Sequence, residues 1–400
     1  MKTPLRFGRY DYASFLALMA YAISSMIIPM VLYQLAKDMH FPLQDGGLGL
    51  GGALQLGRSI PMVISMLLCG FVAAKIGKAW TIGLSLLCMA AGIMSCSIAP
   101  GYVVLFFLIA FAGLGEGVVE GITTPFIQDQ HPDEPGRYIN FTHGFWSIGI
   151  FSVVLVAGWL LLKGVSWRYL VIGAGAFAIL PAMIYLLPDR KKQLKEGTKG
   201  ESFSRVLQHT VKILKTPRFW LFYAAMFLAG GGEYCLTFWT ASYICLEFPG
   251  SDMLLAGIGT ACFAGGMIVG RCGPGFFIKQ HQLPALVIVT GIGAALLSLP
   301  FPWLTSLPLF FLLLFLSGVA TGPFWPSVQS YSVDRMPQLD STMIFVLLSC
   351  AGVPGCGFFT WLMGAAGDLV GIRYSFFLTP LCFIVMTFLI IIERKMKKPV

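Results

Sequence analysis

Twelve long apolar runs recur along this chain of 400 residues, and they constrain its fold more than any other feature. A helix needs about 20 apolar residues to cross the hydrocarbon core of a bilayer, because each residue advances it by about 1.5 Å. Strands of a membrane barrel would be about ten residues long with alternating polarity, which these runs lack. The runs cover residues 11–35, 46–73, 79–99, 101–127, 138–162, 167–187, 218–246, 253–277, 283–300, 307–329, 341–367 and 373–392. The sequence therefore predicts an all-α membrane protein with twelve transmembrane helices.

Composition and the placement of charge agree with this prediction. Hydrophobic residues make up 57% of the chain and charged residues 11%, which excludes a soluble domain. The net charge of +9 does not indicate a nucleic-acid partner, because Lys and Arg collect at the ends of the apolar runs. With a cytoplasmic N-terminus, the cytoplasmic segments hold Lys2, Arg6, Arg9, Lys75, Lys78, Arg137, the cluster from Arg190 to Arg218, Lys279, Arg335 and Arg394 to Lys398, and the other side holds only Lys37, Lys163, Arg168 and Arg373. We expect a multi-pass protein of the bacterial inner (cytoplasmic) membrane with both termini in the cytoplasm.

The longest polar stretch divides the twelve runs into six and six. It contains apolar residues that can share one helical face, namely Val206, Leu207, Val211 and Leu214, while Arg205, Lys212 and Lys215 point elsewhere. This pattern is typical of an amphipathic helix lying on lipid headgroups. We predict an N-terminal six-helix bundle over residues 1–188, a cytoplasmic linker with that helix over 189–217, and a C-terminal six-helix bundle over 218–400.

Two glutamates stand inside the fourth run, where a charge costs about 2.5 to 3.5 kcal/mol on insertion scales. Glu116, Glu120, Thr124 and Gln128 are four residues apart, so they form a polar stripe on one side of a helix. Such a stripe indicates a polar cavity at this depth. We predict that Glu120 handles protons or substrate, with Glu116 either sharing that role or serving structure alone.

The fifth run adds three residues that suit the same cavity. They are Asn140, His143 and Trp146. Asn140 begins a helix on which His143 and Ser147 follow at helical spacing, and counting 1.5 Å per residue puts His143 at about the depth of Glu120. These two side chains could share a proton. The alternative is that both only satisfy neighbouring polar groups.

The second half offers a matching set in the seventh and tenth runs. Carboxylates and amides bond sugar hydroxyls, while aromatic faces cover the apolar face of a pyranose ring. The candidates are Glu233, Thr237, Trp239, Tyr243, Phe324, Trp325 and Gln329. A capping role for Glu233, and packing roles for Phe324 and Trp325, are the structural alternatives.

Two arginines inside apolar runs each need a partner. Arg58 could pair with a carboxylate such as Glu116, or could select an anionic substrate with its planar guanidinium. Arg271, near the inner end of the eighth run, could help to close a cytoplasmic gate.

The loop between the second and third runs carries a family resemblance. Gly70, Lys75, Gly77 and Lys78 stand in a segment that resembles the loop signature of the major facilitator superfamily. The stretch from Gly113 to Gly149 is similar to the fucose–galactose–glucose symporter branch of that superfamily. The resemblance implies a major facilitator fold of two pseudo-symmetric six-helix bundles working by alternating access. It also implies proton or sugar handling for Glu120, and sugar contacts for Asn140 and His143.

The sequence excludes most other classes of protein. It has no Walker-type phosphate loop, no H-E-x-x-H and no clustered metal ligands, so we expect neither an enzyme nor a cofactor. We expect a monomeric secondary transporter that moves a sugar-like solute through the lipid bilayer, with protons as a possible partner. The alternatives are an organic-anion (sugar acid) transporter that uses Arg58, a drug or lipid exporter of the same fold, and a receptor that transports nothing.

Overall fold

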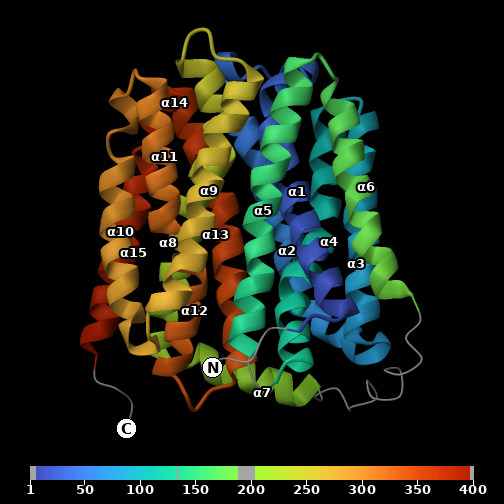
Figure 1. Ribbon diagram of the computed structural model, residues 1–400, viewed down its shortest axis with the longest axis vertical. Helices are drawn as coiled ribbons and strands as arrows, with labels where there is room; N and C mark the ends of the chain where they lie inside the picture. The colour runs from blue at the N-terminus through green and yellow to red at the C-terminus, as the bar shows by residue number, and fades with distance from the viewer. Residues whose placement is uncertain (1–5, 133–134, 188–202, 397–400) are drawn as a thin grey trace.

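The computed structural model describes residues 6–132, 135–187 and 203–396, and within these ranges the chain is helical. Twelve helical segments are long and apolar enough to cross a membrane. The first bundle contains α1 (Arg9–Asp38), α2 (Leu48–Ile76), α3 (Lys78–Ser95), α4 (Tyr102–Gln130), α5 (Pro135–Leu162) and α6 (Trp167–Leu186). The second contains α8 (Pro217–Glu247), α9 (Met253–Phe277), α10 (Leu283–Ser298), α11 (Leu307–Thr321), α12 (Phe324–Arg335), α13 (Ser341–Val370), α14 (Ile372–Ser375) and α15 (Leu378–Lys395). The two bundles stand side by side with their helices roughly parallel (Figure 1).

The twelve predicted spans are therefore confirmed, with two of them broken. The tenth span divides into α11 and α12 at Gly322 and Pro323, and the twelfth divides into α14 and α15. Proline lacks an N–H group, so each proline inside a helix leaves the carbonyl four residues earlier without its usual donor. Short 3-10 turns at Leu43–Asp45, Cys96–Ile98, Gln280–Gln282 and Phe301–Trp303 complete the described elements.

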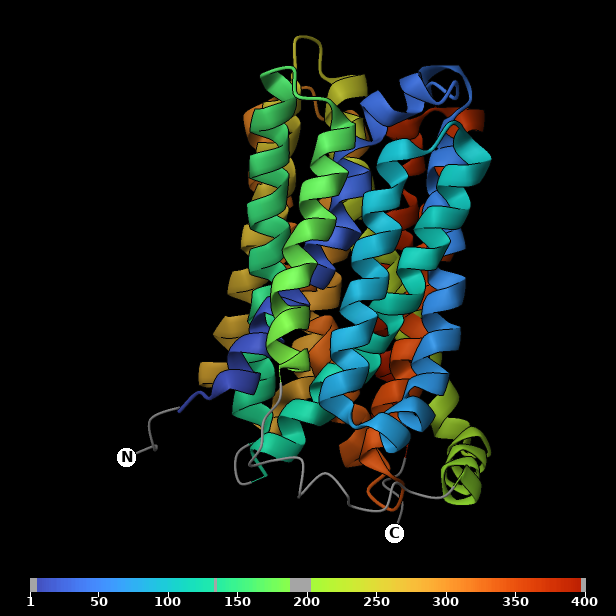
Figure 2. The same ribbon diagram turned by 90° about the vertical axis from the view of Figure 1, so that its right-hand side faces the viewer.

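The helix α7 (Phe203–Leu214) lies across one end of the bundles, which we call the α7 face (Figures 1 and 2). Its apolar residues Leu207, Val211 and Leu214 are exposed, whereas Ile213 is buried. His209 of α7 lies 3.9 Å from Asp340 at the start of α13. Residues 188–202 of the expected linker lie outside the described ranges.

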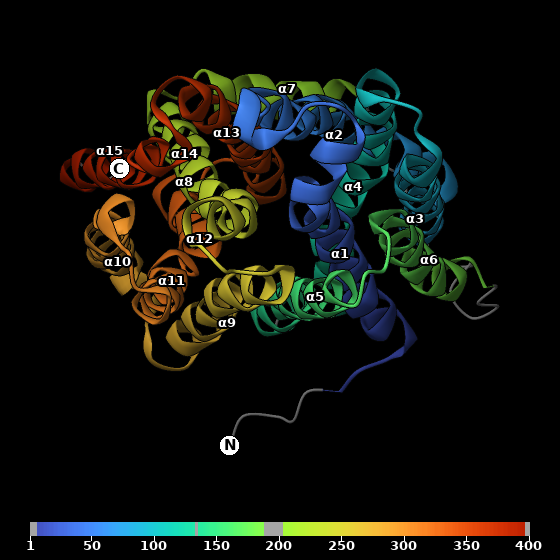
Figure 3. The ribbon, with the colours of Figure 1, turned by 90° about the horizontal axis from the view of Figure 1, so that it is seen from above.

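The bundles meet along two seams, where α2 packs on α13 and α5 packs on α9 (Figure 3). Between the seams, α1 faces α8, and the Ser25 hydroxyl lies 2.6 Å from the Tyr234 hydroxyl. Each seam therefore joins one helix of the first bundle to one of the second. Side chains at these seams are the ones that a relative movement of the bundles would separate.

Candidate functional site

Arg271 of α9 is the point where polar groups of the two bundles converge. Its Nη2 donates to Glu233 Oε1 of α8 at 2.9 Å, and its Nη1 donates to the Ser147 hydroxyl of α5 at 3.3 Å. The guanidinium also lies over the Trp146 ring, 4.8 Å from its centroid, in a cation–π arrangement. The Arg271 and Glu233 side chains are 13% and 8% exposed, so the pair is largely desolvated.

A main-chain carbonyl accepts a further hydrogen bond from Arg271. Its Nε donates to the carbonyl oxygen of Gly322, where α11 ends, at 3.3 Å. The N–H that would normally take this carbonyl belongs to residue 326, which is a proline. The break in the tenth span thus frees an acceptor for the arginine.

Glu120 of α4 faces the same arginine from the first bundle. It is half-buried, lies close enough to Arg271 to interact with its charge, and bonds the Ser349 hydroxyl of α13. That hydroxyl accepts a hydrogen bond from Gln329 Nε2 of α12 at 3.1 Å. A glutamate of each half therefore interacts with one guanidinium, Glu233 at 2.9 Å and Glu120 at longer range.

His143 bonds a neighbour other than Glu120. Its Nε2 lies 2.9 Å from the Thr124 hydroxyl, one turn along α4 from Glu120. The sequence placed His143 and Glu120 at one depth, but the structure pairs the histidine with the threonine. Asn140 lies in α5, and its side chain is outside the described part of the structure.

Arg58 and Glu116 form a second arginine–glutamate pair, within the first bundle. Arg58 Nε donates to Glu116 Oε2 at 2.6 Å, and a second bond joins Nη2 to Oε1. The Ser24 hydroxyl donates to the same carboxylate at 2.5 Å, and the Ser24 and Ser25 carbonyls accept from Arg58 at 2.8 Å and 3.3 Å. The two side chains are 1% and 0% exposed, so neither is open to a solute. Of the two readings of Arg58, this geometry favours the ion pair.

Several predicted binding residues of α8 are buried and bond main-chain carbonyls instead. Trp239 is fully buried and donates to the Thr360 carbonyl at 3.0 Å, and the buried Tyr243 hydroxyl donates to the Phe301 carbonyl at 3.2 Å. The Thr237 hydroxyl bonds the carbonyl of Glu233 within its own helix. These three residues stabilise packing and do not reach Arg271 in this structure.

The aromatic residues of α12 differ from one another. Phe324 is fully buried against Phe383, with ring centroids 5.5 Å apart. Trp325 is half-buried and packs so closely on Gly352 that a Cβ there would lie 2.3 Å from its ring. Of the residues predicted on this span, Gln329 is the one connected to Glu120, through Ser349.

The loop between α2 and α3 forms a tight turn on the α7 face. Gly77 has φ of +87°, a conformation that favours glycine, while Gly70 and Lys75 are exposed. Lys78 Nζ lies 2.6 Å from Asp129 Oδ2 at the end of α4, in an exposed ion pair. This pair links two helices of the first bundle.

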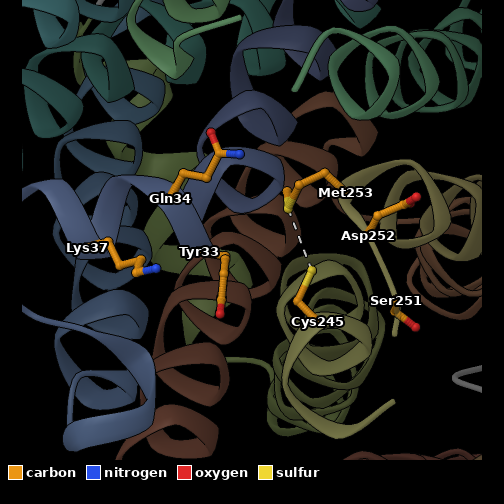
Figure 4. Close-up of a pocket in the computed structure, with 7 residues that line it drawn as sticks. All are labelled: Tyr33, Gln34, Lys37, Cys245, Ser251, Asp252 and Met253. Atoms are coloured by element: carbon orange, nitrogen blue, oxygen red, sulfur yellow. Dashed lines mark hydrogen bonds between the residues drawn. The ribbon is translucent and has the colours of Figure 1, made fainter. Parts of the chain in front are cut away.

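A cavity of about 260 Å³ lies at the face opposite α7, between α1 and the junction of α8 with α9. Tyr33, Gln34 and Lys37 line it from the first bundle, and Cys245 and Ser251 to Met253 line it from the second (Figure 4). Among the described residues, no group of three or more His, Cys, Asp and Glu side chains is arranged to hold a metal ion.

Sequence reasoning found the charged residues of the site but missed Ser349 and the Gly322 carbonyl. Ser349 is one serine in an apolar run and carries no distinguishing spacing. The carbonyl could have been found, because Pro326 marks the acceptor four residues earlier.

Comparisons with known proteins bear on this arrangement. The model of the Major Facilitator Superfamily matches residues 13–337 of the chain. The chain is 27% identical over 216 residues to an oxalate:formate antiporter of Oxalobacter formigenes, covering 51% of this chain and 48% of the antiporter. It is also 27% identical over 177 residues to an uncharacterized transporter of Buchnera aphidicola, covering 42% of this chain and 41% of that protein. The chain thus spans less than half the length of each of these curated relatives.

Solved structures share the fold along nearly the whole chain. The nucleoside transporter NupG has a TM-score of 0.74 and 16% identity, covering 97% of this chain and 99% of NupG. The E. coli xylose transporter XylE gives 0.70 and 12%, with coverage of 95% and 96%. The E. coli fucose:proton symporter FucP gives 0.65 and 17%, with coverage of 96% and 98%. At these identities the likeness shows the fold alone.

Proposed function

Because the chain belongs to the major facilitator superfamily, we propose that it carries a sugar or a similar small polyhydroxy solute across the membrane by alternating access. The chain is a multi-pass membrane transporter and not an enzyme. The proposal concerns the class of solute, the residues that bind it and the coupling to protons.

The observation that carries the proposal is the sharing of Arg271 between the bundles. Glu233 holds the guanidinium from the second bundle, while Trp146 and Ser147 hold it from the first. A solute that replaces some of these bonds interacts differently with the closed and the separated bundles. Such a difference in affinity is what a ligand needs to shift a conformational equilibrium.

The balance of charge favours a neutral solute rich in hydroxyls. When Glu120 and Glu233 are both ionised, two carboxylates stand against one guanidinium, so an anionic solute would meet an excess of negative charge in that state. Hydroxyl groups can donate to the carboxylates and accept from Gln329 or Arg271. The resemblance of residues 113–149 to the fucose–galactose–glucose symporter branch points to the same class.

Glu120 is the residue that we assign to proton coupling. Glu233 has its positive partner at 2.9 Å, whereas Glu120 bonds the neutral Ser349 and shares Arg271 at longer range. A carboxyl group costs less free energy inside an apolar span when it is protonated than when it is charged. Proton binding to Glu120 therefore lowers the cost of moving the site from one face to the other.

A small carboxylate is the second candidate solute. The sequence match to an oxalate:formate antiporter favours it, and Arg271 offers a planar fork that suits a carboxylate. Arg58 is less suited to this role, because it is 1% exposed and fully bonded. A broad drug or lipid exporter is disfavoured by the number of polar groups around Arg271.

The orientation of the chain is also a proposal. The α7 face carries Lys75, Lys78, Lys212 and Arg335, and a basic excess marks the cytoplasmic side of bacterial inner-membrane proteins. We place this face, and with it both termini, in the cytoplasm.

Solute counterflow in proteoliposomes tests the class of solute. The panel contains neutral sugars, sugar acids, oxalate and apolar amines, and we expect exchange of a neutral sugar to exceed that of the rest. Glu233→Gln should lower this exchange at least about tenfold, which corresponds to about 1.4 kcal/mol. Glu247→Gln is the matched control. Glu247 ends the same helix that carries Glu233, and it pairs with Arg373 at 2.9 Å instead of with Arg271. Exchange of oxalate alone would replace the sugar proposal by the carboxylate one, and exchange of apolar amines alone would refute both.

A further inference from the structure

The first turn of α2 is capped by a residue of the other bundle. Its N-cap residue is Gly47, which has no side chain to offer. Asp368, near the end of α13, accepts hydrogen bonds from the backbone N–H groups of Leu48 at 2.9 Å and Gly49 at 2.7 Å. These contacts lie at the face opposite α7 and bridge the seam between α2 and α13.

Helix chemistry makes this contact favourable. The first four N–H groups of a helix have no acceptor within the helix, and the helix dipole places partial positive charge there. A carboxylate that takes two of these groups satisfies both conditions, and its charge strengthens the bonds. Asp368 is exposed, so water competes with it, and the contact can therefore break and re-form.

The backbones around this contact pack without spare room. A Cβ at Gly52 would lie 2.7 Å from the Trp361 Cα, and one at Gly364 would lie 2.4 Å from the Leu48 carbonyl oxygen. The other seam is equally tight at this face, where a Cβ at Gly257 would lie 2.5 Å from the Val154 carbonyl oxygen. The bundles are therefore closed against each other at the face opposite α7.

The α7 ends of the same helices differ. A Cβ at Gly144 of α5 or at Gly273 of α9 would meet no atom within 4 Å. The tight ends of the seams are thus the ends that carry the Asp368 contact.

We propose that Asp368 is a gating residue, which holds the two bundles closed at the face opposite α7 and must release α2 in each transport cycle. An alternating-access protein has to separate the bundles at each face in turn. Because the cap comes from the opposite bundle, its free energy is present only when this face is closed. Loss of the cap therefore shifts the population toward the state that is open at this face.

A native cysteine reports on this equilibrium. Cys245 lines the cavity between the bundles at this face, opposite Tyr33 and Lys37 of α1 (Figure 4). The labelling rate of Cys245 by a bulky, charged maleimide is measured on the whole chain in lipid nanodiscs, with the modified peptide quantified by mass spectrometry. Cys272 is exposed near the C-terminal end of α9, away from the face that Cys245 reports on. Its labelling rate is measured in the same sample as an internal reference.

We expect Asp368→Ala to raise the Cys245 rate about three- to tenfold, the range that loss of a helix cap implies. Asp368→Asn, which keeps a neutral acceptor, should raise it less. Gly49→Ala should also raise it, because the new methyl group would lie 2.9 Å from the Asp368 carboxylate and displace it. The Cys272 rate should not rise in any variant.

Asp340→Ala is the matched control, because Asp340 caps α13 itself by accepting from Met343 N at 2.7 Å within one bundle. The proposal is overturned if Asp368→Ala and Gly49→Ala both label at the parent rate, or if Asp340→Ala labels as fast as Asp368→Ala. The measurement needs no solute, so its result is independent of the class of solute that the chain carries.

Discussion

The two arginine–glutamate pairs in the membrane look alike in sequence and differ in structure. Arg58 and Glu116 belong to one bundle and are sealed from solvent, and the hydrogen bonds described for them lie inside that bundle, with Tyr234 of α8 as a neighbour from the other. Arg271 and Glu233 are largely buried as well, but their surroundings come from both bundles. The first pair can persist unchanged through a movement of the bundles, whereas the second must change its contacts. A charged pair inside a transporter is therefore best classified by which bundles its partners come from.

Both arginines donate to a main-chain carbonyl that stands four residues before a proline. The Ser25 carbonyl, which accepts from Arg58, is freed by Pro29, just as the Gly322 carbonyl is freed by Pro326. A carbonyl freed by a proline is therefore common to the two sites, and it does not explain their difference. What differs is the bundle from which the remaining bonds are supplied.

The largest expected effect is on folding, at the Arg58–Glu116 pair. Arg58→Ala leaves the Glu116 carboxylate buried without its cation, which costs about 3 to 5 kcal/mol. We expect a loss of folded protein, seen as a low monodisperse yield and a lower unfolding temperature in detergent. The double variant Arg58→Met/Glu116→Leu should recover most of the yield, because a well-packed apolar pair can replace a buried ion pair. Full stability of Arg58→Ala alone would break the comparison.

At the Arg271–Glu233 pair we expect a smaller effect on stability and a selective effect on transport. Arg271→Lys keeps the charge but loses the planar fork that bonds Glu233, Ser147 and Gly322 together. Solute exchange in proteoliposomes should fall about tenfold, which corresponds to about 1.4 kcal/mol, while the free energy of unfolding changes less than it does in Arg58→Lys. Arg58→Lys serves as the counterpart and should show the reverse ranking. If both variants lose stability equally, the distinction between the pairs is not functional.

The smallest expected change is at Glu120, and it concerns the coupling of transport to protons. Glu120→Gln keeps a polar group beside Ser349 but cannot release a proton. We expect exchange of solute to persist within about threefold, while the variation of uptake with pH disappears. Uptake is measured across pH with and without an imposed proton gradient. Gradient-driven accumulation by Glu120→Gln equal to that of the parent would remove Glu120 from the coupling mechanism.

The fold followed from the sequence because the hydrocarbon core imposes one length on every span. The glutamates and arginines could be identified as site candidates for a similar reason, since a charge in an apolar run is costly. The choice of partner could not be predicted for Arg271. Its contacts come from α5, α8 and the break between α11 and α12, and no sequence spacing connects these segments.

The seventh span shows why helical spacing failed to select the binding face. Trp239 and Tyr243 follow Glu233 at six and ten residues, and we expected their aromatic rings to face the same solute as Glu233. In the structure, residues 229–244 of α8 are buried on every side. A helix enclosed all round has polar and aromatic residues on several packed faces, so periodicity alone does not distinguish a cavity from a core.

The Gly322 carbonyl has a consequence for how this transporter tolerates mutation. A main-chain oxygen is present whatever side chain stands at its own position, but a Cβ at residue 322 would lie 2.8 Å from the Met267 carbonyl oxygen of α9, so a substitution there would displace the helix that carries Arg271. Residue 326 then decides whether that oxygen bonds the arginine or returns to the helix ladder. The contact thus depends on two residues that supply no side chain to it: a glycine that lets the helices approach, and a proline one helical turn further along.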